Sequence, residues 1–353
     1  MPDYTRATVA QLAEFDTLID VRSPAEYAED HIPGAINCPV LSNGERIRVG
    51  TLYKQESPFA ARKLGAVLVA RNIAQHLETT LNQHPKSWRP LIYCWRGGQR
   101  SGAFTHILRE IGWPAKRLEG GYKSWRRHVL ENLQTLPGGI RFRVIAGPTG
   151  SAKSRLLEAL AAQGAQTLHL EQLAAHKGSV LGDLPDTPQP AQKMFDTRLY
   201  VALSNLDRTR PVFVEAESRQ IGAVRLPESL STAIRSSACL CVEASLSSRV
   251  AFLLQDYGYL CESGRLDAQL MRLKEIQGKE RIMRWQELTK ACDFQTLVTE
   301  LLVEHYDPLY ARSQSRNFAQ LGQATTYVAE DLSSAGLSNL ASRMLSDLDL
   351  LPD

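Results

Sequence analysis

The sequence of 353 residues lacks the features that would place it in a membrane or among secreted proteins. No apolar run approaches the ~18 residues that a bilayer-spanning helix requires. The first residues include acids and form no apolar core, so they do not resemble a signal peptide. Cysteine is scarce, with six residues and no CxxC pair, which excludes a disulfide framework in a chain of this length. These absences predict a cytoplasmic protein with reduced thiols and no membrane partner. The cysteines are Cys38, Cys94, Cys239, Cys241, Cys261 and Cys292.

The small net charge of +3 conceals an uneven distribution. Residues 1–137 carry a net +5, residues 138–290 a net +4 and residues 291–353 a net −6. A basic body suits a polyanionic partner, although charge alone also fits an ordinary solvated surface. The apolar content of 43% excludes wholesale disorder, and the length suggests about two domains.

Strand-like and helix-like segments alternate along the chain, which predicts an α/β fold with mostly parallel sheets. One Pro and two Gly in the segment QTLPGGI indicate a linker. We expect strands at 18–21, 91–93, 142–146, 211–214 and 238–242, and helices at 58–83, 101–111, 153–162, 191–208 and through most of 245–310. We predict an α/β domain over 1–135, a linker over 136–140, a second α/β domain with a helical part over 141–320 and an acidic tail helix over 321–353.

A first candidate site surrounds Cys94, which directly follows the predicted strand Leu91–Tyr93 and precedes a helix. Backbone N–H groups at such a strand end stabilise a thiolate and bind anions. Glycines let this loop curl, and Arg96 and Arg100 add positive charge. The C-x5-R pattern predicts a nucleophilic thiol facing an anion, a chemistry used by both phosphatases and sulfurtransferases. The other expected loop residues are Trp95, Gly97, Gly98, Gln99 and Ser101.

A second candidate site is the segment Gly-Pro-Thr-Gly-Ser-Ala-Lys-Ser over 147–154, which lies between a predicted strand and a predicted helix. This context is the one that a phosphate-binding loop requires. Lys153 would reach phosphate oxygens, and Ser154 would be a Mg²⁺ ligand if that ion binds. Ala152 departs from the usual pattern, which has Gly before the Lys. The remaining residues expected to bind the phosphate through this loop are Gly147, Thr149, Gly150 and Ser151.

Acidic residues follow the predicted strand 211–214 and are the expected partners of the phosphate loop. Glu215 is the first choice for positioning metal or water, and Glu217 the alternate, because side chains two apart share a strand face. Arg219 would complement phosphate charge. A structural role, such as capping the next helix, is an equal alternative for the acids. The eight His show no metal spacing, so we predict neither a zinc site nor a tightly bound cofactor.

Motifs around both loops resemble those of known families. The segments LIDVRSPAEYAEDHIPGAIN over 18–37 and LEGGYKSW over 118–125 resemble rhodanese signatures, in which Asp20, Arg22 and Glu26 would form structural ion pairs. A rhodanese-like domain joined to a P-loop NTPase-like domain resembles the bacterial tRNA 2-selenouridine synthase family. Further carriers of that resemblance are YCWRGGQRSG, GPTGSAKS, LEQLAAHKGSVLG, QPAQKMFD and VEAESRQIG.

The resemblance implies an enzyme that converts wobble 2-thiouridine of tRNA to 2-selenouridine. It implies selenophosphate as the selenium donor, supplied by its synthase, and geranyl diphosphate as the source of an S-geranyl intermediate. Cys94 would then handle selenium, with Arg96 and Arg100 beside it, and the phosphate loop would hold the diphosphate. Two alternatives remain from the residues alone: a kinase or ATPase with a sulfurtransferase domain, and a non-catalytic tRNA-binding sulfur carrier.

Basic residues and tryptophans are the expected contacts to the tRNA anticodon loop. Arg and Lys meet phosphates, and aromatic rings stack on splayed bases. Trp95 is the better stacking candidate, whereas Trp285 fits a core position equally well. An exposed helix face is an equal alternative for the cluster near Trp285. The expected basic contacts are Arg272, Lys274, Lys279, Arg281 and Arg284, together with Arg46, Arg48, Lys54 and Lys63.

Overall fold

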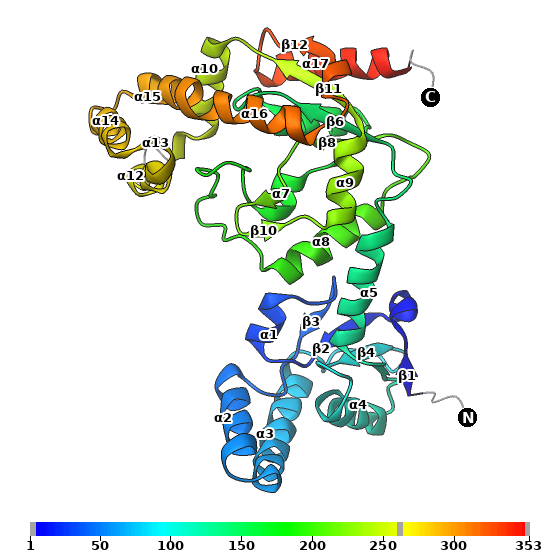
Figure 1. Ribbon diagram of the computed structural model, residues 1–353. Helices are drawn as coiled ribbons and strands as arrows, with labels where there is room; N and C mark the ends of the chain where they lie inside the picture. Colours follow the sequence, from blue (N-terminus) through cyan, green and yellow to red (C-terminus); the bar gives the residue numbers. More distant parts are fainter. Residues whose placement is uncertain (1–4, 260–263, 350–353) are drawn as a thin grey trace. The chain divides into compact units, whose positions relative to one another are not determined.

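The computed structural model describes residues 5–259 and 264–349, which belong to two compact units (Figure 1). The first unit is Met1–Asn132 and the second is Leu133–Asp353. Each is built on a parallel sheet with helices, which confirms the α/β fold class. The change of unit falls inside helix α5, Tyr122–Thr135, just before the predicted linker. No helix among the described residues is long and apolar enough to cross a membrane. Cys261 lies outside the described residues.

The first unit has, within the described residues, five parallel strands in the order β1-β5-β4-β2-β3. Strand β4 is central and buried along its whole length, which explains its continuous apolar run. The strands are β1 Arg6–Ala7, β2 Thr17–Asp20, β3 Ile36–Asn37, β4 Pro90–Tyr93 and β5 Lys116–Leu118. The helices are η1 Val9–Glu14, α1 Pro24–Glu29, α2 Asn43–Gln55, α3 Pro58–Thr79, α4 Gln99–Ile111 and α5.

The second unit has, in the part that the structure describes, five parallel strands in the order β12-β11-β6-β8-β7. The strands are β6 Phe142–Ala146, β7 Gln166–Leu168, β8 Val212–Glu215, β11 Ala238–Glu243 and β12 Thr325–Val328, and β9 Gln220–Ile221 pairs separately with β10 Val224–Arg225. The helices beside the sheet are α6 Lys153–Ala162, α7 Leu170–Ala174, α8 Gln192–Ser204, α9 Glu228–Ser236 and α17 Ser334–Asp349.

A helical region follows strand β11, as the sequence predicted, and has its own apolar core around the buried Trp285. It includes one π-helical segment, η3, Leu301–Tyr306. Its helices are α10 Leu246–Asp256, α12 Leu266–Leu270, η2 Met271–Leu273, α13 Lys274–Gln277, α14 Lys279–Lys290, α15 Phe294–Glu300, η3, α16 Asp307–Asn317 and η4 Leu321–Gln323.

The acidic C-terminal segment contains the helix that the sequence predicted, but the segment belongs to the sheet domain and does not form a tail outside it. Strand β12 pairs in parallel with β11 and extends the sheet of the second unit. Helix α17 buries Leu337, Leu340 and Met344 in the same apolar cluster as Leu156 of helix α6. The physical reason is the apolar face of α17, which is buried only when it packs against the sheet domain.

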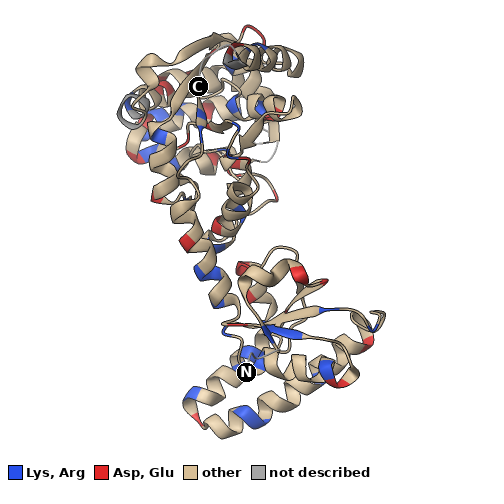
Figure 2. Cartoon of the chain, turned by 90° about the vertical axis from the view of Figure 1, so that its right-hand side faces the viewer, with Lys and Arg blue, Asp and Glu red and all other residues tan. Residues whose placement is uncertain are grey.

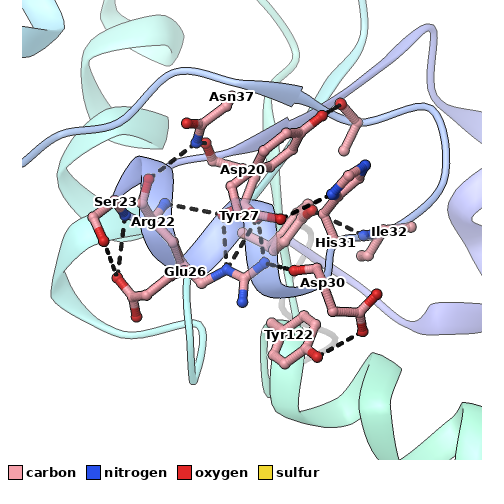
Figure 3. A network of polar contacts seen from close by, with 12 residues as sticks. Asp20, Arg22, Ser23, Glu26, Tyr27, Asp30, His31, Ile32, Asn37 and Tyr122 are labelled. Carbon is pink, nitrogen blue, oxygen red and sulfur yellow. Dashed lines mark hydrogen bonds and ion pairs between the residues drawn. The ribbon is translucent and has the colours of Figure 1, made fainter. Parts of the chain in front are cut away.

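A buried polar network ties the first unit together (Figure 3). Arg22 donates hydrogen bonds to the Asp20 carboxylate, with Nη2 to Oδ2 at 2.5 Å, and also to the Asp30 carbonyl oxygen at 2.6 Å. The Arg22 guanidinium lies 3.9 Å from the ring centre of Tyr122, whose hydroxyl donates to Asp30 Oδ2 at 2.6 Å. The network therefore joins strand β2 and the end of helix α1 to the start of helix α5, which lies 92 residues beyond Asp30.

Removing Arg22 would leave the Asp20 carboxylate buried without its cation, at a cost of about 3–5 kcal/mol. We expect Arg22→Ala to lower the free energy of unfolding of the first unit by that amount. The matched control is Arg89→Ala, because Arg89 pairs with Asp16 at 3.0 Å on the surface, where ion pairs contribute about 1 kcal/mol or less.

Tryptophan fluorescence in urea is the suitable measurement, because four of the five tryptophans lie in the first unit. They are Trp88, Trp95, Trp113 and Trp125. Equal midpoints for the Arg22→Ala and Arg89→Ala variants would contradict the structural role of the buried network.

Candidate active sites

Cys94 lies at the carboxyl end of the central strand β4, as predicted from the sequence, and is almost fully buried. Its Sγ is 3.2 Å from the hydroxyl oxygen of Ser101, which is also buried. Helix α4 begins at Gln99, just after this loop, and the first N–H groups of a helix have no partner within it. This place at the start of a helix suits an anion held beside the thiol.

The Cys94 loop is held from outside by the Gly-Gly turn before helix α5. Backbone N–H groups of Tyr122 and Lys123 donate to the carbonyl oxygens of Cys94 and Trp95 at 2.8 and 3.0 Å. A Cβ atom on Gly121 would lie 2.3 Å from the Cys94 carbonyl oxygen, and Gly121 has a φ of +60°. No side chain fits there, which explains the glycine that precedes Tyr122.

The two arginines of the Cys94 loop occupy different electrostatic environments. Arg100 is largely buried and donates a hydrogen bond to Glu26 at 2.8 Å. Burial raises the pKa of Glu26, but the hydrogen bond and charge of Arg100 outweigh it and hold the pKa below its usual range. Glu26 therefore stays ionised and compensates Arg100. Arg96 is exposed and has no ion pair among the described residues, so it is the cation available to an incoming anion.

The remaining predicted residues of this loop lie on its solvent side. Gly98 and Gln99 are exposed, and Gly97 and Trp95 are half-buried. The Trp95 ring centre is 5.3 Å from that of Tyr122, so one part of the indole packs within the unit. The exposed part remains a surface for a planar ligand.

The phosphate loop follows strand β6 and leads into helix α6, in the context that the sequence predicted. The Lys153 ammonium donates to the carbonyl oxygens of Gly147 and Pro148 at 2.9 and 3.4 Å. Ala152 has the left-handed φ of +56°, where L-residues carry a cost of about 1–2 kcal/mol. The chain thus accepts strain at the position where the pattern has Gly, and the loop still forms.

Arg249 fastens the phosphate loop to the helical region, a role that the sequence reasoning missed. Its Nε donates to the Thr149 carbonyl oxygen at 2.8 Å, and its guanidinium pairs with Asp307 at 2.5 and 3.1 Å. Arg249 is 6% exposed. The residue is isolated from any motif in the sequence, so only the fold brings it to the loop.

Three carboxyl groups gather beside Lys153 and Ser154. The predicted Glu215 ends strand β8 and accepts the backbone N–H of Leu170 at 3.0 Å. Glu171, which the sequence reasoning did not select, accepts the Ser154 hydroxyl at 2.6 Å. The alternate candidate Glu217 lies close enough to Glu171 for the two carboxyls to shift each other's pKa.

Burial shifts all three carboxyls towards the neutral form. It raises the pKa of Glu215 to about 8, and the charge of Glu171 adds to this rise. It raises the pKa of Glu217 to about 8 for the same reasons. It also raises the pKa of Glu171, against the hydrogen bond from Ser154 and the charge of Lys153. Proton uptake therefore lowers the negative charge beside the phosphate loop at neutral pH.

These groups line a cavity of about 540 Å³ in the second unit. Lys177 lies at this cavity and is anchored by Asp256 at 2.6 Å and by the Tyr257 ring at 4.2 Å. The structure brings to the cavity six of the residues predicted for anion binding, namely Thr149, Gly150, Lys153, Ser154, Glu215 and Glu217.

The other residues predicted for anion binding lie elsewhere. Gly147 and Ser151 contribute to the conformation of the loop and do not line the cavity. A Cβ on Gly147 would collide with the Val242 carbonyl oxygen, and the Ser151 hydroxyl donates a hydrogen bond to the Pro148 carbonyl oxygen. Arg219 does not line the cavity and pairs with Glu228 at 3.1 Å on the surface. Among the described residues, no group of three or more His, Cys, Asp or Glu is arranged to hold a metal ion.

The predicted tRNA cluster near Trp285 is largely neutralised by ion pairs. Arg272 pairs with Asp183 at 2.6 Å, Arg281 with Glu304 at 2.7 Å, and Arg284 with Glu300. Lys274 and Lys279 are exposed. The Trp285 side chain is fully buried and donates to Glu300 at 3.1 Å. Trp285 is therefore a core residue.

The thiol loop and the phosphate loop each lie within a range of the chain that matches a known protein family. A model described as the rhodanese-like domain matches residues 5–128, and one described as the tRNA 2-selenouridine synthase AAA domain matches residues 140–265. The tRNA 2-selenouridine synthase of Nitrosomonas europaea is 39% identical over 264 residues, which cover 72% of this chain and 67% of that protein. That of Marinobacter nauticus is 33% identical over 326 residues, covering 83% and 87%.

A third relative extends the similarity over nearly all of this chain. The tRNA 2-selenouridine synthase of Nitrosomonas eutropha is 33% identical over 342 residues, which cover 95% of this chain and 84% of that protein. The thiol loop, the phosphate loop and these alignments agree, and the chain belongs to the tRNA 2-selenouridine synthase family.

Proposed function

We propose that this protein replaces the sulfur of wobble 2-thiouridine in tRNA with selenium, through an S-geranyl intermediate. The observation that carries the proposal is the presence of two separate anion loops in one chain, one with a thiol and one without. Relatives of similar length carry the name of the tRNA 2-selenouridine synthases. The thiol loop suits the selenium step, and the phosphate loop suits the diphosphate of the alkylating step.

The alkylating step needs a diphosphate held while its ester bond breaks. The thiouridine sulfur forms a bond to the first carbon of geranyl diphosphate, the carbon–oxygen bond breaks, diphosphate leaves, and the proton on N3 of the base is released to water. Lys153 and the loop amides would hold that diphosphate. The pKa of about 8 for Glu215 and Glu217 supports this role, because protonated carboxyls do not repel a diphosphate at neutral pH. Mg²⁺ entering with the ligand would bind Ser154 and Glu171, which already meet at 2.6 Å.

In the selenium step the alkylated sulfur is the leaving group. Selenium from selenophosphate forms a bond to the base carbon, the carbon–sulfur bond breaks, and the sulfur leaves as geranylthiol, while water takes up the phosphoryl group. Arg96 and the amides of the Cys94 loop would bind the selenophosphate oxyanion. Cys94 would act as a nucleophile at that base carbon: its sulfur displaces geranylthiol and then leaves again as selenium bonds to the carbon. Ser101 is its polar neighbour at 3.2 Å.

Two substitutions separate these steps. We expect Lys153→Ala to lower S-geranyl-thiouridine formation by about 100-fold, because a preorganised charge beside the leaving group is lost. We expect Cys94→Ser to leave geranylation intact and lower selenouridine formation by about 100-fold or more. The matched control is Cys292→Ser, since Cys292 is an exposed thiol far along the chain from both loops.

Mass spectrometry of nucleosides from thiolated tRNA, incubated with geranyl diphosphate and selenophosphate, measures both products. Unchanged selenouridine in the Cys94→Ser reaction would remove the thiol from the selenium step. Unchanged geranylation with Lys153→Ala would remove the phosphate loop from the alkylating step.

The helical hairpin formed by α2 and α3 is the surface that we assign to tRNA. Figure 2 marks its Lys and Arg residues, all of which are exposed. Arg48, Lys54 and Lys63 have no ion pair among the described residues, in contrast to the arginines near Trp285. The hairpin also exposes Tyr53 and Phe59, at 54% and 72%. Unpaired cations beside exposed aromatic rings are the combination that binds phosphates and bases.

Neutralising three hairpin cations at once should weaken tRNA binding. We expect Arg48→Ala, Lys54→Ala and Lys63→Ala together to raise the Kd about 10-fold or more and to reduce the slope of log affinity against log salt by about two. The matched control is a triple variant of Lys274, Lys279 and Lys290, which also removes three exposed positive charges by substitution with Ala.

Filter binding of tRNA over a range of salt concentrations measures both quantities. A larger effect from the control triple than from the hairpin triple would move the tRNA surface to the helical region.

A further inference from the structure

The phosphate-loop cavity contains a buried histidine that neither the alkylating step nor the selenium step uses. His305 lines this cavity, and its side chain is 1% exposed. It belongs to the π-helical segment η3, and π-helical turns are rare and occur frequently at functional sites. Burial lowers the pKa of His305, so its imidazole is neutral at neutral pH. A neutral imidazole has one donor and one acceptor nitrogen, and its use depends on which nitrogen carries the proton.

The neighbours of His305 fix the position of that proton. Arg281, which is held by Glu304 at 2.7 Å, donates a hydrogen bond from Nη1 to Gln277 Oε1 at 2.6 Å. A guanidinium can only donate, so the amide oxygen of Gln277 faces Arg281, and the amide nitrogen lies 2.8 Å from His305 Nδ1. Because that amide nitrogen donates, Nδ1 accepts, and the proton of the neutral imidazole lies on Nε2.

The Nε2–H group of His305 lacks an acceptor among the described residues. Native structures rarely leave a buried donor without a partner, because its desolvation is then not repaid. Gln277 occupies Nδ1, so Nε2–H is the part of the ring that a molecule in the cavity can reach. The cavity volume of about 540 Å³ has room for about forty water molecules, which is more than a diphosphate and a pyrimidine ring require together.

The hydrogen bond from Gln277 indicates that the missing acceptor is uncharged. An imidazolium carries a hydrogen on Nδ1 as well, and that hydrogen would face the Gln277 amide hydrogens. The contact therefore opposes the charged form of His305. A phosphate would gain from a charged donor, whereas a neutral donor suits a carbonyl oxygen. Neutral histidines polarise substrate carbonyl groups in this way.

Under the proposed function, a carbonyl group enters this cavity. The thiouridine sulfur must reach the first carbon of geranyl diphosphate while Lys153 holds the diphosphate. The base therefore lies beside the phosphate loop during the alkylating step. Its C4 carbonyl oxygen, O4, is an acceptor on the ring edge, whereas cytosine has a donor amino group at the same position.

We propose that His305 Nε2 donates a hydrogen bond to O4 of the thiouracil ring and so selects thiouridine in the alkylating step. This inference rests on the proposed function. The hydrogen bond draws electron density towards O4, which makes N3–H more acidic and favours release of the N3 proton to water as the sulfur is alkylated. No bond to His305 forms or breaks, and its proton stays on Nε2. His305 is then a specificity-determining residue, and Gln277 is a positioning residue that sets its tautomer.

The first test compares two bases on the unaltered full chain. tRNA with either 2-thiouridine or 2-thiocytidine at the wobble position is incubated with geranyl diphosphate, and the S-geranyl nucleosides are measured by mass spectrometry. We expect kcat/KM to favour 2-thiouridine by about 100-fold or more, because the cytosine amino group opposes Nε2–H. Equal values for the two bases would overturn the assignment. S-geranyl product from neither tRNA would overturn the proposed alkylating function, and this inference with it.

A matched pair of substitutions tests the donor itself. The amide N–H of Gln reaches the position of Nε2, whereas the shorter Asn reaches only that of Nδ1. We expect His305→Asn to lower thiouridine geranylation about 100-fold and to reduce the preference over 2-thiocytidine. His305→Gln should retain activity within about 10-fold of the unaltered protein and keep the preference. Unchanged geranylation with His305→Asn, or an equal loss in both variants, would overturn the assignment.

Calorimetric titration with geranyl diphosphate and Mg²⁺ separates the base from the diphosphate. We expect both His305 variants to bind geranyl diphosphate within about 2-fold of the unaltered protein, which also shows that they fold. Binding that is about 10-fold weaker in folded His305→Asn protein would place His305 at the diphosphate and overturn the contact to O4.

Gln277→Glu tests the tautomer without changing the histidine. A carboxylate at this position still accepts from Arg281, but it also accepts from His305 Nδ1, so the proton of the neutral imidazole moves away from Nε2. ¹⁵N NMR of the imidazole distinguishes the two tautomers. At about pH 8, we expect the proton on Nε2 in the unaltered protein and on Nδ1 in the variant, with geranylation lowered about 10-fold or more. A proton on Nδ1 in the unaltered protein, or full activity in a variant with its proton on Nδ1, would overturn the inference.

Discussion

Both candidate sites depend on the same arrangement, in which a central parallel strand ends in a loop that leads into a helix. At that point backbone N–H groups have no partner within the helix, and they attract negative charge. The chain has this arrangement twice, after β4 and after β6, and each time places a different reactive group there. Cys94 stands at the first loop and Lys153 at the second. The two units thus share the same strand–loop–helix arrangement for binding anions and differ in the reactive side chain that the loop carries.

Each loop is kept in place by buried charge from elsewhere in its own unit. Glu26 compensates Arg100 beside the thiol, and Asp307 compensates Arg249 behind the phosphate loop. Breaking either pair would leave an uncompensated ion in a buried place, which costs more than the pair itself contributes. The carboxyls near Lys153 are also buried, and their raised pKa values favour the neutral, protonated form over an uncompensated negative charge. The charge left for ligands is therefore concentrated on Arg96, Lys153 and the backbone amides.

Local sequence patterns predicted five strands, namely β2, β4, β6, β8 and β11, several of the helices and both loops, because strand–loop–helix junctions are encoded within about ten consecutive residues. They did not predict the short strands β1, β3, β5, β7, β9 and β10 or the sheet strand β12. They also predicted Glu215, which ends its own strand. They did not predict Glu171, Arg249 or the pairing of Arg272 with Asp183, because those contacts join segments far apart in the chain. The place of α17 in the sheet domain was missed for a related reason. Its acidic composition suggested a tail, whereas its buried leucines determine where it packs.

The division of labour between the two loops is tested most directly by bypassing one of them. The protein with Lys153→Ala is given tRNA that already carries S-geranyl-2-thiouridine, together with selenophosphate, and the nucleosides are analysed by mass spectrometry. If the phosphate loop serves only the alkylating step, this variant forms selenouridine at a rate close to that of the unaltered protein, while Cys94→Ser does not. Failure of Lys153→Ala on the geranylated tRNA would contradict separate roles for the two loops.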